Sequence, residues 1–480
     1  MYLVSAAAGE LTATTRRTAG PERLYLSRYS VDMHTGTDSQ PHAIQEINGS
    51  ALYRKISLRL IPYMFLLYIL AYLDRVNVGY AAIQMKADLH LSDTVYGTGA
   101  GVFFLGSALF DIPSNLILAR VGPRKWMARI MITWGIVAAC MSLVHSPTSF
   151  YALRFMLGLS EAGFFPGMIL YLTYWFPSRQ RAKAVARFMT ATAIAGVVGG
   201  PISSTLLGLT GVGGLRGWQW LFIAEGIPTM LFGISVLFLL NDHPSEAKWL
   251  SPPEREWLEN EVQQDRKQLG SNKHHNFMDA LKLPALYLLA IVFFGDQVCV
   301  YVINLWLPLF LNSMRGVSHL SGAAMDRWAV LPYLVTALAM VVVGWSSDRS
   351  NDRRFHVALC LLCSAFGFAM ATRAHSLAEV LVAFSLATIG VFSLQGPFWT
   401  WLTSMLEGTA AAGGIAIITC LGGFGAFLGQ VTVGHLSDRS HNYTSGLFTV
   451  AGVALVAAAA AICLRNGSGT SQAGPTAKTL

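Results

Sequence analysis

Long apolar stretches alternate with short polar connections along most of this chain. Six such stretches lie near residues 57–81, 95–118, 125–144, 149–172, 182–208 and 219–240, and six more near 284–313, 325–346, 355–373, 377–402, 409–436 and 445–465. Most reach the roughly 20 helical residues that cross a hydrocarbon core about 30 Å thick. Backbone polar groups in lipid must pair within their own segment, and stretches this long exclude the shorter strands of a barrel. The pattern predicts an all-α polytopic membrane protein with twelve transmembrane helices.

Polar segments divide the twelve apolar stretches into two sets of six. We expect a disordered cytoplasmic tail, an N-terminal six-helix bundle, a cytoplasmic linker, a C-terminal six-helix bundle and a C-terminal tail at residues 1–50, 51–240, 241–283, 284–465 and 466–480. Within the linker, the sequence from Ser251 to Glu254 contains two prolines, which favour the start of a polar helix that runs through Gln268. Two such bundles place a substrate at their interface, near the middle of the bilayer.

Composition and charge also indicate that the protein lies in a lipid bilayer. The 480 residues are 53% hydrophobic and 12% charged, with a mean hydropathy of +0.48 and a net charge of +8. The basic residues do not form one soluble patch, which argues against a nucleic-acid partner. They flank apolar stretches on one side, for example at Arg54, Lys55, Arg59, Arg120, Arg124, Lys125, Arg129, Arg179, Arg181, Lys183 and Arg187. This distribution predicts cytoplasmic N- and C-termini in a multi-pass protein of the cell inner membrane.

Short arginine-bearing turns recur along the chain. One follows the second apolar stretch at 120–125, and another follows the eighth at 344–349. A third, Ser437-Asp438-Arg439-Ser440, repeats the second but falls on the outer side in the predicted topology. We interpret the third copy as coincidence.

Nothing in the sequence predicts a cofactor, a metal or an enzyme active site. The six cysteines fall within apolar stretches, and Cys360 and Cys363 form a C-x-x-C pair without a second pair to complete a metal site. We find no phosphate-binding glycine loop, nucleophile elbow or metal-ligand cluster. ATP-driven transport and membrane hydrolysis therefore have no support.

Four charged residues lie inside the first and fourth apolar stretches: Asp74, Arg75, Arg154 and Glu161. A charge at mid-membrane costs at least ~2.5–3.5 kcal/mol on insertion scales, so these residues need a reason. Arg154 and Glu161 are seven residues apart, about 10 Å along one helix face. Both are therefore expected to line one cavity.

Asp74 and Arg75 project about 100° apart, so each needs its own partner. We expect Asp74 to pair with Arg154, which leaves the planar fork of Arg75 for a substrate carboxylate. An anion that engages the arginines would leave Asp74 or Glu161 ready to bind a proton, and linkage makes this coupling reciprocal. The alternative is a structural ion pair without a role in transport.

Several motifs resemble the major facilitator superfamily and, within it, the anion:cation symporter family. The resemblance rests on Tyr72–Gly79, Pro113–Asn115, Arg154–Gly158 with Glu161–Gly167, Tyr171–Pro177 and Gly217–Phe222, and covers roughly residues 50–465. It implies the major facilitator fold, proton sites at Asp74 and Glu161, and substrate or gating roles for Arg75 and Arg154. The second half is less similar: Trp306-Leu307-Pro308 and Phe398-Trp399-Thr400 resemble family positions, but Thr419 and Gly423 stand where relatives tend to carry asparagines.

Further candidates are polar or aromatic residues in the spans. Tyr72, Tyr301, Asn304 and Trp399 offer hydrogen bonds and stacking to a substrate, although such residues also merely pack. Asp111 and Glu225, placed near helix ends, are interpreted as caps or interfacial pairs. Asp296 stays open between a structural and a functional role, and Pro166 is expected to bend the fourth helix beside Glu161.

We therefore predict a proton-coupled symporter that imports a small organic anion, such as a dicarboxylate, sugar acid or aromatic carboxylate, and acts as a monomer. A proton/drug antiporter or facilitator of the same fold is the alternative, but it would favour acidic residues without an arginine fork. A non-transporting membrane sensor is the third possibility, although the tails and linker are too short for a sizeable output domain.

Overall fold

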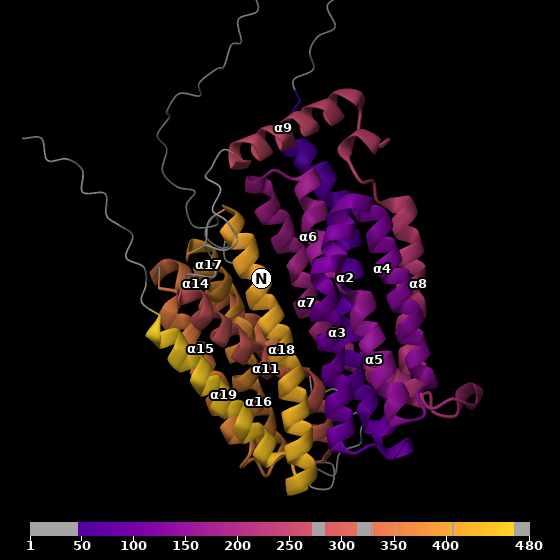
Figure 1. Ribbon diagram of the computed structural model, residues 1–480, viewed down its shortest axis with the longest axis vertical. Coiled ribbons are helices and arrows are strands. Elements are labelled where there is room, and N and C mark those ends of the chain that lie inside the picture. Colours follow the sequence, from indigo (N-terminus) through magenta and orange to yellow (C-terminus); the bar gives the residue numbers. More distant parts are fainter. Residues whose placement is uncertain are drawn as a thin grey trace, which may run out of the picture.

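The chain folds into two bundles of helices that stand side by side (Figure 1). The computed structural model describes residues 47–270, 284–313, 328, 330–350, 352–405 and 408–464, and every regular element in these ranges is a helix. The first bundle comprises α2 (Gly49–Asp88), α3 (Asp93–Val121), α4 (Pro123–Cys140), α5 (Pro147–Glu161), α6 (Phe164–Trp175), α7 (Ser178–Leu207) and α8 (Gly217–Leu239). The second comprises α11 (Pro284–Ser313), α14 (Leu331–Ser350), α15 (Arg354–Ala371), α16 (Leu377–Ser393), α17 (Gln395–Met405), α18 (Gly408–Ser440) and α19 (Thr444–Cys463).

These helices have the dimensions of membrane spans. In the described ranges, eleven crossings are long and apolar enough to span a bilayer, with α5–α6 and α16–α17 each counted once. A further apolar segment, Ile194–Leu207, forms the second half of the 30-residue helix α7. The predicted all-α fold of two helical bundles is confirmed.

The first helix begins earlier than the sequence pattern indicates. The side chain of Asn48 accepts hydrogen bonds from the backbone N–H groups of Ser50 and Ala51, at 3.1 and 3.2 Å. An N-cap of this kind satisfies donors that lack a partner within the helix. Residues 49 and 50, predicted as part of the tail, therefore belong to the start of α2, with Asn48 as its N-cap, while residues 1–46 lie outside the described residues.

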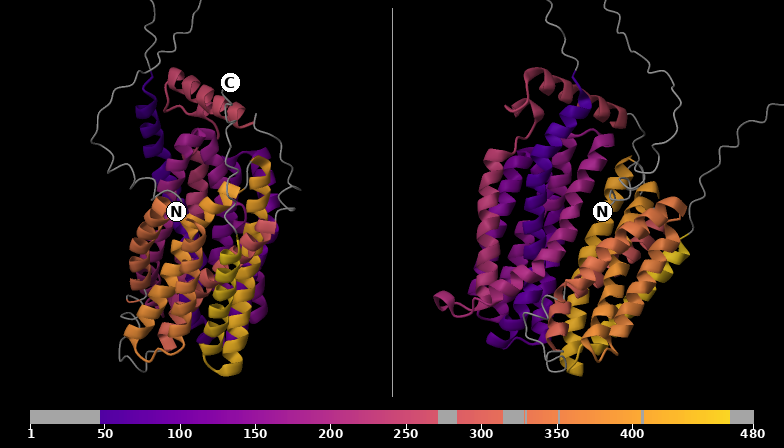
Figure 2. Two further views of the ribbon diagram at one scale, coloured as in Figure 1. Left: turned by 90° about the vertical axis from the view of Figure 1, so that its left-hand side faces the viewer. Right: turned by 180° about the vertical axis from the view of Figure 1, so that it is seen from behind.

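A polar helix, α9 (Pro252–Gly270), crosses one end of the first bundle, as Figures 1 and 2 show. It covers the segment for which a polar helix is predicted. Lys55 Nζ of α2 lies 2.8 Å from Glu254 Oε2 of α9. We refer to this end of the molecule as the α9 end, and to the other as the opposite end. Three short 3₁₀ turns complete the first half: η1 (Met141–Leu143), η2 (Val212–Gly214) and η3 (Pro244–Glu246).

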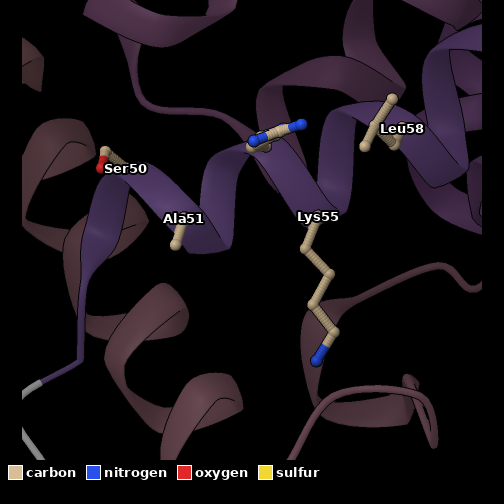
Figure 3. Close-up of a pocket in the computed structure, with 5 residues that line it drawn as sticks. Ser50, Ala51, Lys55 and Leu58 are labelled. Atoms are coloured by element: carbon tan, nitrogen blue, oxygen red, sulfur yellow. The ribbon is translucent and has the colours of Figure 1, made fainter.

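A recess of about 500 Å³ lies beside the start of α2 (Figure 3). Its lining comprises Ser50, Ala51, Arg54, Lys55 and Leu58. The recess is open to the surface and contains none of the residues predicted to bind substrate or protons. It is therefore separate from the candidate site.

The two bundles make their closest contacts toward the opposite end. A Cβ atom on Gly97 of α3 would lie only 2.3 Å from the carbonyl oxygen of Gln430 of α18, so glycine is needed for this approach. Nearby, the hydroxyl of Tyr96 donates a 2.9 Å hydrogen bond to the carbonyl of Leu305 in α11. Small residues at such crossings bring helix backbones together in membrane proteins.

Candidate functional site

The fourth predicted span is a broken helix. It ends as α5 at Glu161 and restarts as α6 at Phe164, and Gly163 between them has φ +83°, in the left-handed region. Ser114 Oγ donates to the Ala162 carbonyl at 2.7 Å, and the Gly163 N–H donates to Asp111 Oδ1 at 2.7 Å. These two bonds satisfy the backbone groups that the break frees. Asp111 thus supports the start of α6, although its predicted place near a helix end is wrong, since it is the nineteenth of 29 residues in α3.

The fourth span bends at Gly163, so the prediction of a bend at Pro166 is wrong. Pro166 lies in the first turn of α6, where its missing N–H costs no helical hydrogen bond. The change of direction occurs at Gly163, which adopts the left-handed conformation without the penalty that a side chain would bring. As a result, Glu161 occupies the last position of α5.

Glu161 forms an ion pair with Arg75 of α2 inside the first bundle. The residue Glu161 is 2% exposed, while a quarter of the Arg75 side chain is exposed. The second carboxylate oxygen of Glu161 accepts no hydrogen bond from any residue in the described ranges. Arg75 is therefore already engaged by an acid, instead of being free as the sequence predicts.

Asp74 has neutral hydrogen-bond donors as its partners. It accepts hydrogen bonds from the indole N–H of Trp134 in α4 and from Asn77 Nδ2, the latter at 3.0 Å. The predicted ion pair between Asp74 and Arg154 is wrong, because no salt bridge among the described residues joins these two side chains. The physical reason is the 100° step along α2, which turns Arg75 toward α5 and Asp74 toward α4.

Arg154 is fully buried, with 0% of its surface exposed. Its Nη2 donates a 3.3 Å hydrogen bond to the Ala100 carbonyl of α3, and its Cζ lies 4.7 Å from the ring centre of Phe103. Nε and Nη1 have no partner among the residues described. One turn further along α5, Gly158 makes this approach to α3 possible, since a Cβ there would lie 1.9 Å from the Phe103 carbonyl.

Arg75 and Arg154 share an aromatic neighbour. The Cζ of Arg75 lies 6.0 Å from the centre of the Phe103 ring that Arg154 contacts. Such contacts stabilise a guanidinium through the ring quadrupole, but they leave its N–H donors available. Two guanidinium groups beside one aromatic ring, that of Arg154 fully buried and that of Arg75 partly buried, are suited to hold an anion.

Residues from the second bundle complete this region. Tyr301 of α11 packs on Phe104 of α3 with ring centres 4.1 Å apart, and Tyr72 lies beside Tyr301, Asn304 and Arg75. Asn304 Oδ1 also accepts a 2.9 Å hydrogen bond from the hydroxyl of Tyr333. The structure therefore brings together five predicted substrate or proton residues on the first bundle and two on the second, at the interface of the bundles.

Trp399 belongs to a different cluster. Its indole N–H donates to Gln395 Oε1 at 3.2 Å, and its ring lies 5.3 Å from that of Phe293 in α11. The contacts among the described residues do not join Trp399 to Arg75 or Arg154.

Three residues surround Asp74, of which sequence reasoning missed Asn77 and Trp134 and named Glu225 without this contact. Asn77 bridges Asp74 to Glu225 of α8, with 2.8 Å from its Nδ2 to Glu225 Oε2, and Trp134 is the third. Glu225 is buried nine residues into a 23-residue helix, so its predicted place near a helix end is wrong. One signal was available: Asn77 follows Asp74 by three residues, which places it on the same helix face.

The described residues contain no group of three or more His, Cys, Asp or Glu side chains that could hold a metal ion. Two helical bundles with this polar cluster at their interface define a secondary transporter.

Comparison with known proteins places the chain in one family. The model of the Major Facilitator Superfamily matches residues 64–430, and the chain belongs to this superfamily. It is a multi-pass membrane transport protein, as the resemblance of its motifs implies.

The chain is also similar to individual known proteins. A protein of Agrobacterium vitis named "Putative tartrate transporter" is 44% identical over 411 residues, which cover 86% of this chain and 94% of that protein. The quinolone resistance transporter of Acinetobacter baumannii is 37% identical over 395 residues, or 82% and 90% of the two chains. Among solved structures, an inward-facing and occupied bacterial homologue of the human lysosomal transporter Spinster matches with a TM-score of 0.68 at 18% identity, over 85% of this chain and 96% of that one. This last likeness concerns the fold alone.

Proposed function

We propose that this chain is a proton-coupled symporter that imports a small organic anion across the inner membrane, with Arg75 and Arg154 as the anion-binding cations. A hydroxylated dicarboxylate of the tartrate type is the first substrate to test, because the Agrobacterium vitis relative carries tartrate in its name. Sugar acids and aromatic carboxylates are the next classes.

The observation that supports the proposal is the unequal use of the two arginines. Arg75 is paired with Glu161, whereas Arg154 is fully buried with two of its three guanidinium nitrogens unpartnered among the described residues. A buried charge without a counter-ion is costly unless something compensates for it. A substrate carboxylate supplies this compensation through charge-assisted hydrogen bonds.

Coupling follows from competition for Arg75. A substrate anion that engages the Arg75 guanidinium displaces Glu161 from it, and a buried carboxylate without a cation binds a proton. Asp74, held by Trp134 and Asn77, is the second proton site of the first bundle in this scheme. By linkage, the proton in turn favours the bound anion.

The hydroxyls and amide at the interface give selectivity. Tyr72 of the first bundle lies near Arg75 and beside Tyr301 and Asn304 of the second, so a substrate held there touches both moving parts. Alternating access then follows from rocking of the bundles around the site. Trp399, which contacts Gln395 and Phe293, is not assigned a direct contact with the substrate in this proposal.

The test is a measurement of internal pH in dye-loaded proteoliposomes while tartrate isomers, sugar acids and aromatic carboxylates are added outside. We expect acidification by one or a few anions, and its loss in Glu161→Gln, which keeps a hydrogen bond to Arg75 but carries no titratable proton. Glu256→Gln, an exposed carboxylate on α9, is the matched control and is expected to behave as wild type. Uptake of labelled anion without acidification would refute proton coupling.

A drug antiporter is the second candidate, because of the similarity to the quinolone resistance transporter. Quinolones carry a carboxylate, so the arginine pair is compatible with them as anions. Adding a fluoroquinolone to the panel separates the two: alkalinisation of proton-loaded vesicles identifies antiport, and acidification identifies symport.

A further inference from the structure

A further buried acid lies in the other bundle. Asp296 of α11 has 0% of its surface exposed. Its Oδ2 accepts hydrogen bonds from Gln395 Nε2 of α17 at 2.6 Å and from Gln297 Nε2 at 2.9 Å. Its Oδ1 has no hydrogen-bond partner among the described residues.

The position of Asp296 within its helix is central. It is the thirteenth of 30 residues in α11, about 18 Å along the axis from the first residue. Ionisable side chains at this depth in a membrane are expensive and generally serve a function. The helix α11 also carries Tyr301 and Asn304 of the substrate region, one and two turns further on.

No cation described in the structure compensates Asp296. The titratable groups that face it are the thiols of Cys299 on the same helix and Cys360 on α15. Neither is a base that could pair with a carboxylate, and the salt bridges within the described residues do not involve Asp296. The two amide groups donate only to Oδ2, so Oδ1 is the atom at which a proton satisfies the group.

We propose that Asp296 is a further proton-binding site of the transport cycle, in the C-terminal bundle, which takes up a proton at Oδ1 from one side of the membrane and releases it to the other. The inference rests on the proposed proton coupling and extends it: the transporter moves one more proton per anion than the first bundle alone would carry.

The surroundings give this proton a route and a means of control. Gln297, Gln395 and Trp399 are each only partly buried, so they link the enclosed acid to more accessible space. A Cβ on Gly422 of α18 would lie 3.0 Å from Gln297 Cγ, and further along the same helix Gln430 contacts Gly97 of the first bundle. A shift of α18 between the bundles therefore acts on a donor of Asp296.

The assignment also gives Trp399 a positioning role. Its indole N–H donates to Gln395 Oε1, which orients the Gln395 amide nitrogen toward Asp296. This hydrogen bond fixes the orientation of the Gln395 amide, because the oxygen and the nitrogen of a glutamine side chain differ mainly in that one accepts and the other donates hydrogen bonds.

The experiment is a measurement of the proton-to-anion ratio in proteoliposomes, from the anion gradient that just balances an imposed pH gradient. Asp296→Asn mimics the protonated acid, and we expect its ratio to be lower than that of wild type by one proton, with anion transport retained. Asp296→Glu keeps the titratable group and is expected to restore the ratio. Glu379→Gln, at the exposed start of α16, is the control carboxylate and should leave the ratio unchanged.

The outcomes separate this inference from the proposed function. A wild type without any proton movement would refute proton coupling as a whole. A coupled wild type with the same ratio in Asp296→Asn would refute only the role of Asp296. If Asp296→Asn does not fold, infrared difference spectra of the wild type and of Asp296→Glu test the site instead. A protonated-carboxyl band that changes when anion is added to the wild type, and that is absent at the same frequency in Asp296→Glu, supports the site. A band that does not change in either protein overturns it.

Discussion

The carboxylate of Asp438, at the end of α18, caps the first turn of α3 by accepting a 2.8 Å hydrogen bond from the backbone N–H of Asp93. A second bond of 2.8 Å comes from the N–H of Thr94. The positive end of α3 thus meets an acid that belongs to the other bundle, an arrangement that favours both groups. Asp438 lies in the third arginine-bearing turn, which the sequence led us to interpret as coincidence, and that interpretation missed its contact.

We predict that Asp438→Asn weakens closure of the bundles at the opposite end. The substitution removes the charge that interacts with the α3 terminus, a contribution of about 0.3–1 kcal/mol at such sites. Spin labels at the exposed positions Val212 of the first bundle and His441 of the second report the separation. We expect a larger population of long distances in the variant.

Asp352→Asn is the control for that measurement. Asp352 also accepts from a helix-terminal N–H, that of Phe355 at 3.2 Å, but both residues belong to the second bundle. Its substitution should leave the distance between the bundles unchanged. Equal distance distributions in Asp438→Asn and wild type would show that the contact does not hold the bundles together.

A second prediction concerns the shape of the Arg154 side chain. Arg154→Lys keeps the positive charge but loses the planar fork of donors, so we expect KM for the transported anion to rise by about 10- to 100-fold, as for the loss of a charged hydrogen bond. The measurement is initial uptake against anion concentration. Arg129→Lys is the control, because Arg129 also lies over an aromatic ring, with Cζ 4.4 Å from the Trp126 ring centre, but takes no part in the site. An unchanged KM in Arg154→Lys would remove Arg154 from anion binding.

The sequence predicted which charged residues are enclosed in the first bundle better than it predicted how they pair. Hydropathy alone identifies the spans, because the cost of exposing backbone to lipid leaves few alternatives. The charged residues of the first bundle can also be picked out from the sequence, because a charge inside an apolar span is costly. Pairing depends on the rotation of each helix, and a 100° step along α2 decides that Arg75, not Asp74, meets α5.

Other features were hidden because they depend on contacts distant in sequence. Trp134 and Glu225 become neighbours of Asp74 only when α4 and α8 pack against α2. The break after Glu161 was also misplaced, since a proline is a visible signal whereas the left-handed turn at Gly163 relies on bonds from Asp111 and Ser114.

A third prediction concerns the attachment of α9 to α2 at different pH. Partial burial acts to raise the pKa of Glu254, but the hydrogen bonds from Lys55 and Ser251 outweigh it and lower that pKa below its ordinary value. A lowered native pKa means that the stabilisation is present above the ordinary value of about 4.3 and is lost as the pH falls through the native pKa. We expect hydrogen-exchange protection of α9, corrected for intrinsic rates, to decrease over that acidic range.

Glu254→Gln should remove this part of the pH dependence. The exposed Glu256→Gln on the same helix serves as the matched control and should retain it. Identical pH profiles for wild type and Glu254→Gln would mean that other contacts, such as that between Gly49 and Trp257, hold α9 in place.

The last prediction addresses the break between α5 and α6. In Gly163→Ala, an L-residue must adopt φ +83°, which costs about 1–2 kcal/mol, and its Cβ would lie 2.3 Å from Ser114 Oγ. We expect a lower melting temperature in detergent and a loss of anion uptake, because displacing Ser114 disturbs the end of α5 that carries Glu161. Gly211→Ala isolates the backbone cost, since Gly211 has φ +93° with no atom within 4 Å of the added Cβ. If the two variants lose stability equally and both retain uptake, the bonds at the break do not position Glu161, and its place at the end of α5 is not required for transport.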